Sequence, residues 1–119
     1  MGKIDFSMFL STCGISNQQH PVAEQLGFKN VFWMYGLFVE DEFGISRDEL
    51  RHRLAQRGIE TRTFFIPIHL QPIYYNHFKG QKFPVAEELC FRGLYLPSAS
   101  GLTTEEIRFV CQSVKECRK

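Results

Sequence analysis

One ten-residue stretch limits the fold of this chain more than any other: residues 31–40, with the sequence VFWMYGLFVE. Successive side chains of a strand point to opposite faces of the sheet, and here both faces are apolar. A strand of this kind has to be covered on two sides, so we expect it to lie centrally in its sheet. The side chains divide into one face with Val31, Trp33, Tyr35, Leu37 and Val39 and another with Phe32, Met34 and Phe38.

The segment after this strand carries the signals of a capped helix. Ser46 suits the N-cap, and Glu49 three residues later completes a capping box. Gly58 supplies the left-handed position at which such a helix ends. Most of the basic side chains lie off the apolar stripe of Leu50, Leu54 and Ala55, which favours a solvated face over a phosphate site. These basic residues are Arg47, Arg51, His52 and Arg57.

Two further strands and a second helix are expected in the middle of the chain. Residues 61–66 form the second strand, and residues 71–83 form a loop or a short helix. The second helix begins at Pro84, which suits the first helical position, and stops at Gly93. Residues 94–96 then form a short third strand.

The last helix repeats the capping pattern of the first. Thr103 is its expected N-cap, Glu106 completes the capping box, and Leu102 can contact Ile107 as a hydrophobic staple. Its buried face is expected to consist of Ile107, Val110, Cys111 and Val114.

This order of elements predicts an α/β fold: a small sheet of about three strands with helices packed mainly on one face. Right-handed crossovers favour that one-sided arrangement in a small sheet. The other face would carry large apolar side chains, and such patches are rare on soluble monomers. It therefore needs a partner, which is either the N-terminal segment or a second copy of the chain.

Size, charge and cysteines narrow the class of protein. A chain of 119 residues fits one domain, and its net charge of +1 gives no electrostatic footprint for nucleic acid or an anionic membrane. No apolar run approaches the span of a bilayer, and the N-terminus lacks a signal-peptide layout. The four cysteines lack metal-site spacing and are expected to be reduced. We therefore expect a soluble, cytoplasmic protein without a metal.

The stretch at residues 58–72, GIETRTFFIPIHLQP, supplies the link to a known family. Together with VFWMYGLFVEDEFGISRDEL before it and PVAEEL and LYLPSASGLTTEEI after it, it resembles the C-terminal small domain of the DegT/DnrJ-type PLP-dependent sugar aminotransferases. The resemblance covers roughly residues 30–118 and implies the small-domain fold of fold-type I aminotransferases. We therefore divide the chain into an atypical N-terminal segment, residues 1–29, and an aminotransferase-like small domain, residues 30–119.

The resemblance also implies which side chains lie near the substrate pocket of an intact enzyme, where a sugar nucleotide would bind. They are Arg62, Phe64, Phe65, His69 and Tyr74, with Tyr75 beside them. The residues by themselves leave alternatives open. His69 could instead hydrogen-bond a neighbouring backbone group and lock its loop, Arg62 could pair with Glu60 or Glu40, and the tyrosines could simply pack.

The cofactor machinery of the family is not recognisable in this sequence. PLP transamination needs a lysine imine and a partner for the pyridine nitrogen, and no lysine here stands in the family's cofactor context. No glycine-rich loop is present to hold a phosphate. We therefore expect no catalytic residue and no cofactor in this chain, and a detached or truncated domain that does not transaminate alone. The alternatives are a module that binds a small ligand or a protein, and a folded relic without a function.

A detached small domain would expose the surface that meets its large domain, so we expect a homodimer. Closed two-fold dimers are the commonest way to bury a self-complementary patch. The contact would include Phe32, Trp33, Met34 or Phe38. The alternative is a monomer in which residues 1–29 fold over the sheet.

Overall fold

The computed structural model of the chain describes residues 15–17 and 33–119. The expected N-terminal segment, apart from residues 15–17, lies outside the described residues, as do Val31 and Phe32 of the expected central strand. The strands are β1 (Ile15–Asn17), β2 (Gly36–Val39), β3 (Arg62–Thr63) and β4 (Gly93–Tyr95). The α-helices are α3 (Arg47–Gln56), α4 (Pro72–Tyr75), α5 (Pro84–Arg92) and α6 (Thr104–Glu116), and the 3₁₀ turns are η1 (Asp41–Phe43) and η2 (Ile68–Leu70).

The described strands form one sheet in the order β1-β2-β4-β3, and every neighbouring pair is antiparallel. The α/β class is confirmed, and β2 lies inside the sheet as expected, between β1 and β4. The rule of right-handed crossovers does not explain the helix arrangement, because it governs parallel strands and this sheet is antiparallel. The three expected strands are present, and residues 15–17 add a fourth along the free edge of β2.

The central strand is shorter than expected because the backbone at Met34 adopts a left-handed conformation, with φ at 63°. A left-handed residue breaks the alternation of a strand. Trp33 is therefore 74% exposed and does not share a buried face with Leu37, which corrects the expected division of faces. Pairing still continues past the end of the strand, since the Leu96 N–H donates to the Tyr35 carbonyl at 3.0 Å.

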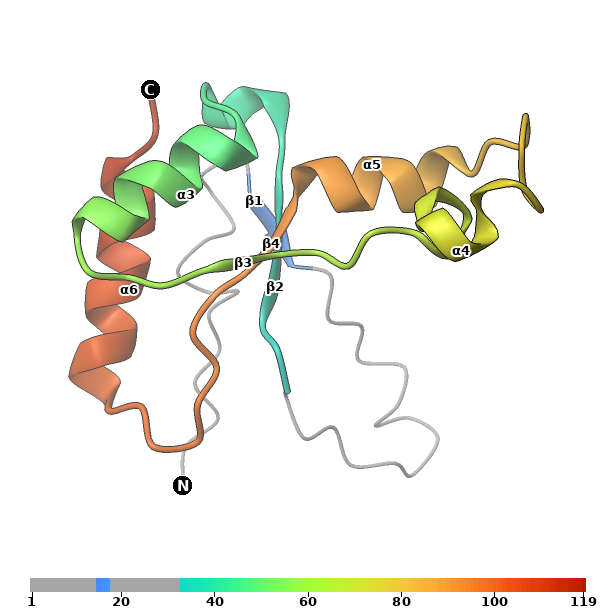
Figure 1. The fold of residues 1–119 in the computed structure, drawn as a ribbon. Coiled ribbons are helices and arrows are strands. Elements are labelled where there is room, and N and C mark those ends of the chain that lie inside the picture. The colour runs from blue at the N-terminus through green and yellow to red at the C-terminus, as the bar shows by residue number, and fades with distance from the viewer. Residues whose placement is uncertain (1–14, 18–32) are drawn as a thin grey trace, which may run out of the picture.

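The core lies between one face of the sheet and the two longest described helices, α3 and α6, which lie together on one side of it (Figure 1). Leu37, Leu94, Leu50, Leu54 and Val114 are fully excluded from water. The expected buried face of α6 is confirmed, and Ser113 and Cys117 extend it.

The caps of the two core helices differ in one respect. At α6 both halves of the expected capping box are present: the Thr103 N–H donates to Glu106 Oε2 at 2.7 Å, and the Glu106 N–H donates to Thr103 Oγ1 at 3.2 Å. At α3, Ser46 Oγ accepts from the Glu49 N–H, but the Glu49 carboxylate accepts from Arg53 Nε at 2.8 Å instead. The capping box expected at Ser46 is therefore only half formed.

The other face of the sheet is covered in part by an aromatic ring of this same chain. The Phe64 ring stacks on Tyr95 with 4.4 Å between centroids, and it lies over Gly36 and Gly93. A Cβ at Gly36 would come within 2.9 Å of the ring, and one at Gly93 within 2.5 Å. Two glycines thus create the space into which Phe64 packs.

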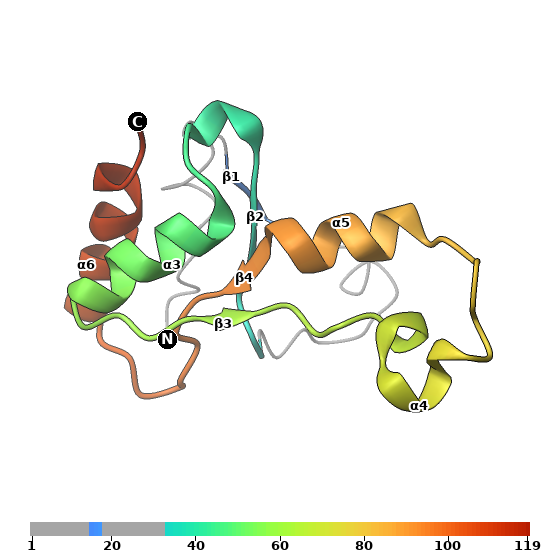
Figure 2. The ribbon, with the colours of Figure 1, turned by 45° about the horizontal axis from the view of Figure 1, so that its top comes forward.

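Helix α5 extends away from α3 and α6, on the other side of the sheet (Figures 1 and 2). Residues 65–83, here named the arm, run out along α5 and turn back to its N-terminal end, and they include η2 and α4. Among the described residues, no helix has the length and apolar character needed to cross a membrane.

Candidate functional site

Most of the exposed large apolar side chains of the described residues lie in the arm. Such side chains need burial, and contiguous exposed ones mark a surface that meets something else. The exposed apolar residues of the arm are Phe65, Ile66, Ile68, Leu70, Ile73, Tyr74, Tyr75 and Phe83. The predicted site residues Phe65 and Tyr74 belong to this set, so their side chains are free to contact a ligand or another protein.

His69 is the exception within the arm, because it is buried. Its Nε2 lies 2.9 Å from Glu87 Oε1 in α5, and its ring contacts Phe83 with 4.7 Å between centroids. The expectation that His69 bonds a backbone group is therefore wrong, and its partner is a carboxylate 18 residues further along the chain.

Glu87 is a partner of His69 that sequence reasoning missed. The same oxygen that meets His69 also accepts the Phe83 N–H at 2.9 Å, at the N-terminal end of α5. The Phe83 N–H and then His69 hold the pKa of Glu87 below its ordinary value. The signal that could have found it is its place in the first turns of a helix that begins at a proline, where a carboxylate is favoured.

The remaining predicted site residues lie closer to the sheet. Arg62 is exposed in β3, and no ion pair joins it to Glu60 or Glu40 in the described part of the chain. Phe64 is part of the sheet packing, where its ring stacks on Tyr95. The Phe65 ring also contacts Tyr95, in a tilted arrangement with 6.0 Å between centroids. The structure thus groups Phe64 and Phe65 around Tyr95 and places His69 apart from them, against α5.

Arg47 does not belong to a solvated basic face. Its side chain is 11% exposed, and its Nη1 donates to the carbonyls of Cys90 at 3.0 Å and Gly93 at 2.9 Å. These carbonyls lie at the C-terminal end of α5, where a cation is favoured. Arg47 therefore joins the start of α3 to the end of α5.

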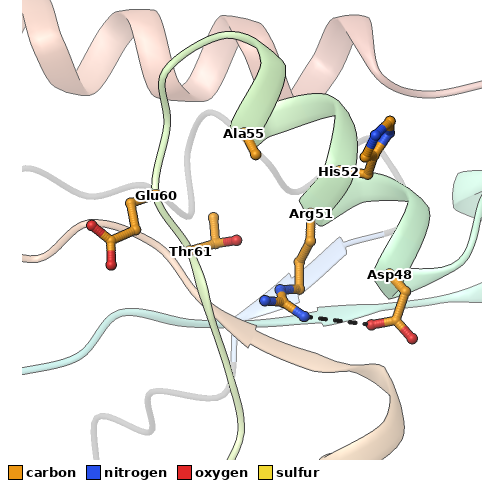
Figure 3. A pocket seen from close by; sticks show the side chains of 6 residues that line it. All are labelled: Asp48, Arg51, His52, Ala55, Glu60 and Thr61. Carbon is orange, nitrogen blue, oxygen red and sulfur yellow. Dashed lines mark ion pairs between the residues drawn. The ribbon is translucent and has the colours of Figure 1, made fainter.

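A separate open pocket of about 490 Å³ lies between α3 and the segment that leads into β3 (Figure 3). Its lining residues are Asp48, Arg51, His52, Ala55, Glu60 and Thr61. Figure 3 shows Arg51 reaching toward Asp48, with 3.9 Å between the charged atoms, and the Glu60 carboxylate pointing away from both. Two carboxylates and one guanidinium give no net attraction for an anion, and none of the predicted site residues lines this pocket.

The lysines among the described residues are Lys79, Lys82, Lys115 and Lys119, and none of them lines the pocket. They therefore offer no enclosed amine for an imine. In the same part of the chain no three His, Cys, Asp or Glu side chains gather as metal ligands. Burial raises the pKa of the Cys111 and Cys117 thiols, which are free.

The fold of this chain is similar to part of several aminotransferases of known structure. DesV of S. venezuelae, solved with a ketimine intermediate, is 28% identical with a TM-score of 0.77, covering 93% of this chain and 28% of that one. TlmJ of Streptoalloteichus hindustanus, at 24% identity and a TM-score of 0.77, covers 94% of this chain and 28% of its own and shows the shared fold.

The chain belongs to the DegT/DnrJ/EryC1/StrS aminotransferase family, whose sequence model matches residues 8–115. This confirms the resemblance on which the site residues rest, and the family is PLP-dependent. GDP-perosamine synthase of Escherichia coli O157:H7 is 39% identical over 87 residues, which are 73% of this chain and 23% of the relative. The synthase of Vibrio cholerae is 31% identical over 102 residues, 86% of this chain and 27% of the relative. The chain thus spans about a quarter of the length of these relatives.

Proposed function

We propose that this chain serves as the C-terminal small domain of a PLP-dependent aminotransferase that acts on a nucleotide sugar. It would supply groups on the substrate side, and the cofactor lysine would come from a large domain. The observation that carries the proposal is the arm, which projects from a closed core and combines exposed aromatic residues with a buried, fixed His69. The names of the GDP-perosamine synthases support a nucleotide sugar as the substrate class.

The side chains have chemistry that suits this role. The rings of Phe65 and Tyr74 are exposed and can stack on a base or a sugar. Arg62 is exposed and can hold a phosphate or carboxylate with two parallel hydrogen bonds. His69 has two ring nitrogens, one that can donate and one that can accept a hydrogen bond. Phe64 would support these side chains from the side of the sheet, because its ring packs over Gly36 and Gly93.

A chimera tests the proposal directly. This chain would replace the matching C-terminal quarter of the Escherichia coli GDP-perosamine synthase. We expect the chimera to transaminate, and His69→Ala within it to lower kcat/KM at least about tenfold, as loss of a positioned acid–base group does. Phe109→Ala, on an exposed site of α6 outside the arm, is the control. A folded, PLP-loaded chimera without activity would refute the proposal.

We further propose that the chain alone does not transaminate. The described lysines lack an enclosed setting, and an imine needs one to persist in water. Mixing the purified chain with PLP and recording the absorbance spectrum tests this. A stable internal-aldimine band that disappears when one particular lysine is replaced would overturn it.

We also propose self-association as a homodimer. The exposed apolar residues of the arm and Trp33 support it, and Phe38 would lie beside the contact. Sedimentation equilibrium at micromolar concentration measures it, and a single monomeric species would defeat it. A truncation from Gly27 that then dimerised would show that residues 1–29 cover the sheet. The same exposed side chains support the second candidate function, a binding module without enzymatic activity.

A cytoplasmic location is part of this proposal. The three described cysteines, Cys90, Cys111 and Cys117, are free thiols, which a reducing compartment preserves. Alkylation of cell extract before and after denaturation should find these thiols reduced. Disulfide-linked peptides from freshly quenched cells would contradict the location.

A further inference from the structure

Helix α5 is fixed to the core at its C-terminal end. Arg47 donates to the Cys90 and Gly93 carbonyls, and Arg92 pairs with Asp41 of η1 at 2.8 Å. The Arg92 guanidinium also lies over the Phe38 ring of β2, at 5.9 Å from its centroid. Two guanidinium groups therefore join the C-terminal end of α5 to the core.

The N-terminal end of α5 is joined to the arm through one carboxylate oxygen. Glu87 Oε1 accepts the Phe83 N–H and meets His69 Nε2, both at 2.9 Å. The Phe83 ring packs against the His69 ring, and Phe78 contacts Phe83 at 6.0 Å between centroids. The stretch of the arm around His69 and the stretch that ends at Phe83 thus meet at Glu87.

We propose that Glu87 is the positioning residue for His69, and that α5 is a rigid element that fixes the position of the arm relative to the core. The inference rests on the proposed function in one respect, that the His69 loop is the part of the chain that meets the substrate. Without Glu87, nothing polar among the described residues would fix the His69 ring relative to α5.

The contact also selects the protonated ring nitrogen. An ionised carboxylate can only accept hydrogen bonds, so the proton of a neutral His69 sits on Nε2, and Nδ1 is the acceptor. The charged groups that act on this pair in the structure are Glu87 itself and Lys82, whose charge favours the ionised carboxylate. His69 would therefore reach the substrate site in a single tautomer.

The test uses the 119-residue chain and three variants. Glu87→Ala removes both hydrogen bonds, Glu87→Gln keeps an oxygen that can accept them, and Glu88→Ala removes a carboxylate from the same helix that pairs with Arg92 instead. Nitrogen-15 NMR, recorded at a pH where the chemical shifts themselves show a neutral ring, reports the ring tautomer. Hydrogen exchange reports the amides of Leu70, Gln71 and Phe83 in the arm and of Val110 and Val114 in α6.

We expect the Nε2–H tautomer in the wild type and in Glu87→Gln, and a mixture of tautomers in Glu87→Ala. In Glu87→Ala the arm amides should exchange about tenfold faster while the α6 amides keep their rates, because only a local opening becomes easier. Glu88→Ala should match the wild type in the arm.

Three results would overturn the inference: an Nδ1–H tautomer in the wild type, unchanged arm exchange in Glu87→Ala, or an equal acceleration in α6. The tautomer is read in the unaltered chain, so the test survives a variant that does not fold. None of these measurements involves PLP or a sugar nucleotide. A failed chimera and a failed positioning role are therefore separate outcomes.

Discussion

The core and the arm of this domain are held by different forces. In the core, Leu37, Leu54 and Leu94 are completely buried between the sheet and α3 and α6. In the arm, Phe65 and Ile73 are 72% and 79% exposed, and the fixed point is the polar contact of His69 with Glu87. Burial of a large apolar side chain contributes about 1.5–3 kcal/mol, whereas one hydrogen bond contributes about 1 kcal/mol net. Folding stability therefore resides in the core, and the arm can be altered without unfolding the domain.

The strongest test of this difference between core and arm is a matched pair of substitutions to alanine, one in each region. Leu54→Ala should lower the free energy of unfolding by about 3 kcal/mol, because it leaves a cavity in a fully buried site. Ile73→Ala in α4 should change it by less than about 0.5 kcal/mol, because that side chain is exposed. Urea unfolding measures both. Equal losses would mean that the arm is part of the cooperative core.

The junction between the two regions should be sensitive to a single methyl group. Gly93→Ala places a Cβ against the Leu89 carbonyl and 2.5 Å from the Phe64 ring, so both the α5 backbone and the Phe64 ring have to move. Such overpacking costs about 1–3 kcal/mol. Gly101→Ala, which has nothing within 4 Å of its Cβ, is the control. Thermal or urea unfolding of both variants tests the point, and a neutral Gly93→Ala would show that neither the Leu89 carbonyl nor Phe64 is fixed at this position.

Substitution at the N-cap of α6 tests how much the edge of the core contributes to folding stability. Thr103→Ala removes the side-chain acceptor of the Glu106 N–H and should cost about 1 kcal/mol in urea unfolding. Thr104→Ala, at the next position, keeps the capping box and should cost less. An unchanged midpoint for Thr103→Ala would mean that the end of α6 is capped in another way.

The smallest expected effect is on the pH dependence of folding stability. The Thr103 N–H and hydroxyl hold the pKa of Glu106 below its ordinary 4.5. The ionised carboxylate therefore favours the folded state above about pH 4.5, and this contribution is lost as the pH falls through the lower folded pKa. Urea midpoints should fall less steeply on acidification in Glu106→Gln than in the wild type, and Glu105→Gln is the control. A steeper fall in Glu106→Gln would reverse the assigned direction.

Local signals in the sequence predicted most of the core. The caps at Ser46, Gly58 and Thr103 and the buried stripe of α6 are recognisable because each depends on residues at most a few positions apart. The family resemblance selected the site residues, of which Phe65, His69 and Tyr74 lie on the arm, and their closeness to a substrate stays a prediction. The same short-range logic failed at Glu49, whose carboxylate had two possible partners and bonded Arg53.

By itself, the sequence determined the fold class, the central place of β2 and the ends of α3 and α6, because local hydrogen bonds and the alternation of apolar residues act over short distances. Only the tertiary structure decided the antiparallel order of the strands, the burial of Arg47 at the end of α5 and the meeting of His69 with Glu87. These features join residues 18 or more positions apart. Such contacts form only once the sheet and helices have packed, and packing sets which charged group is removed from water and therefore must find a partner.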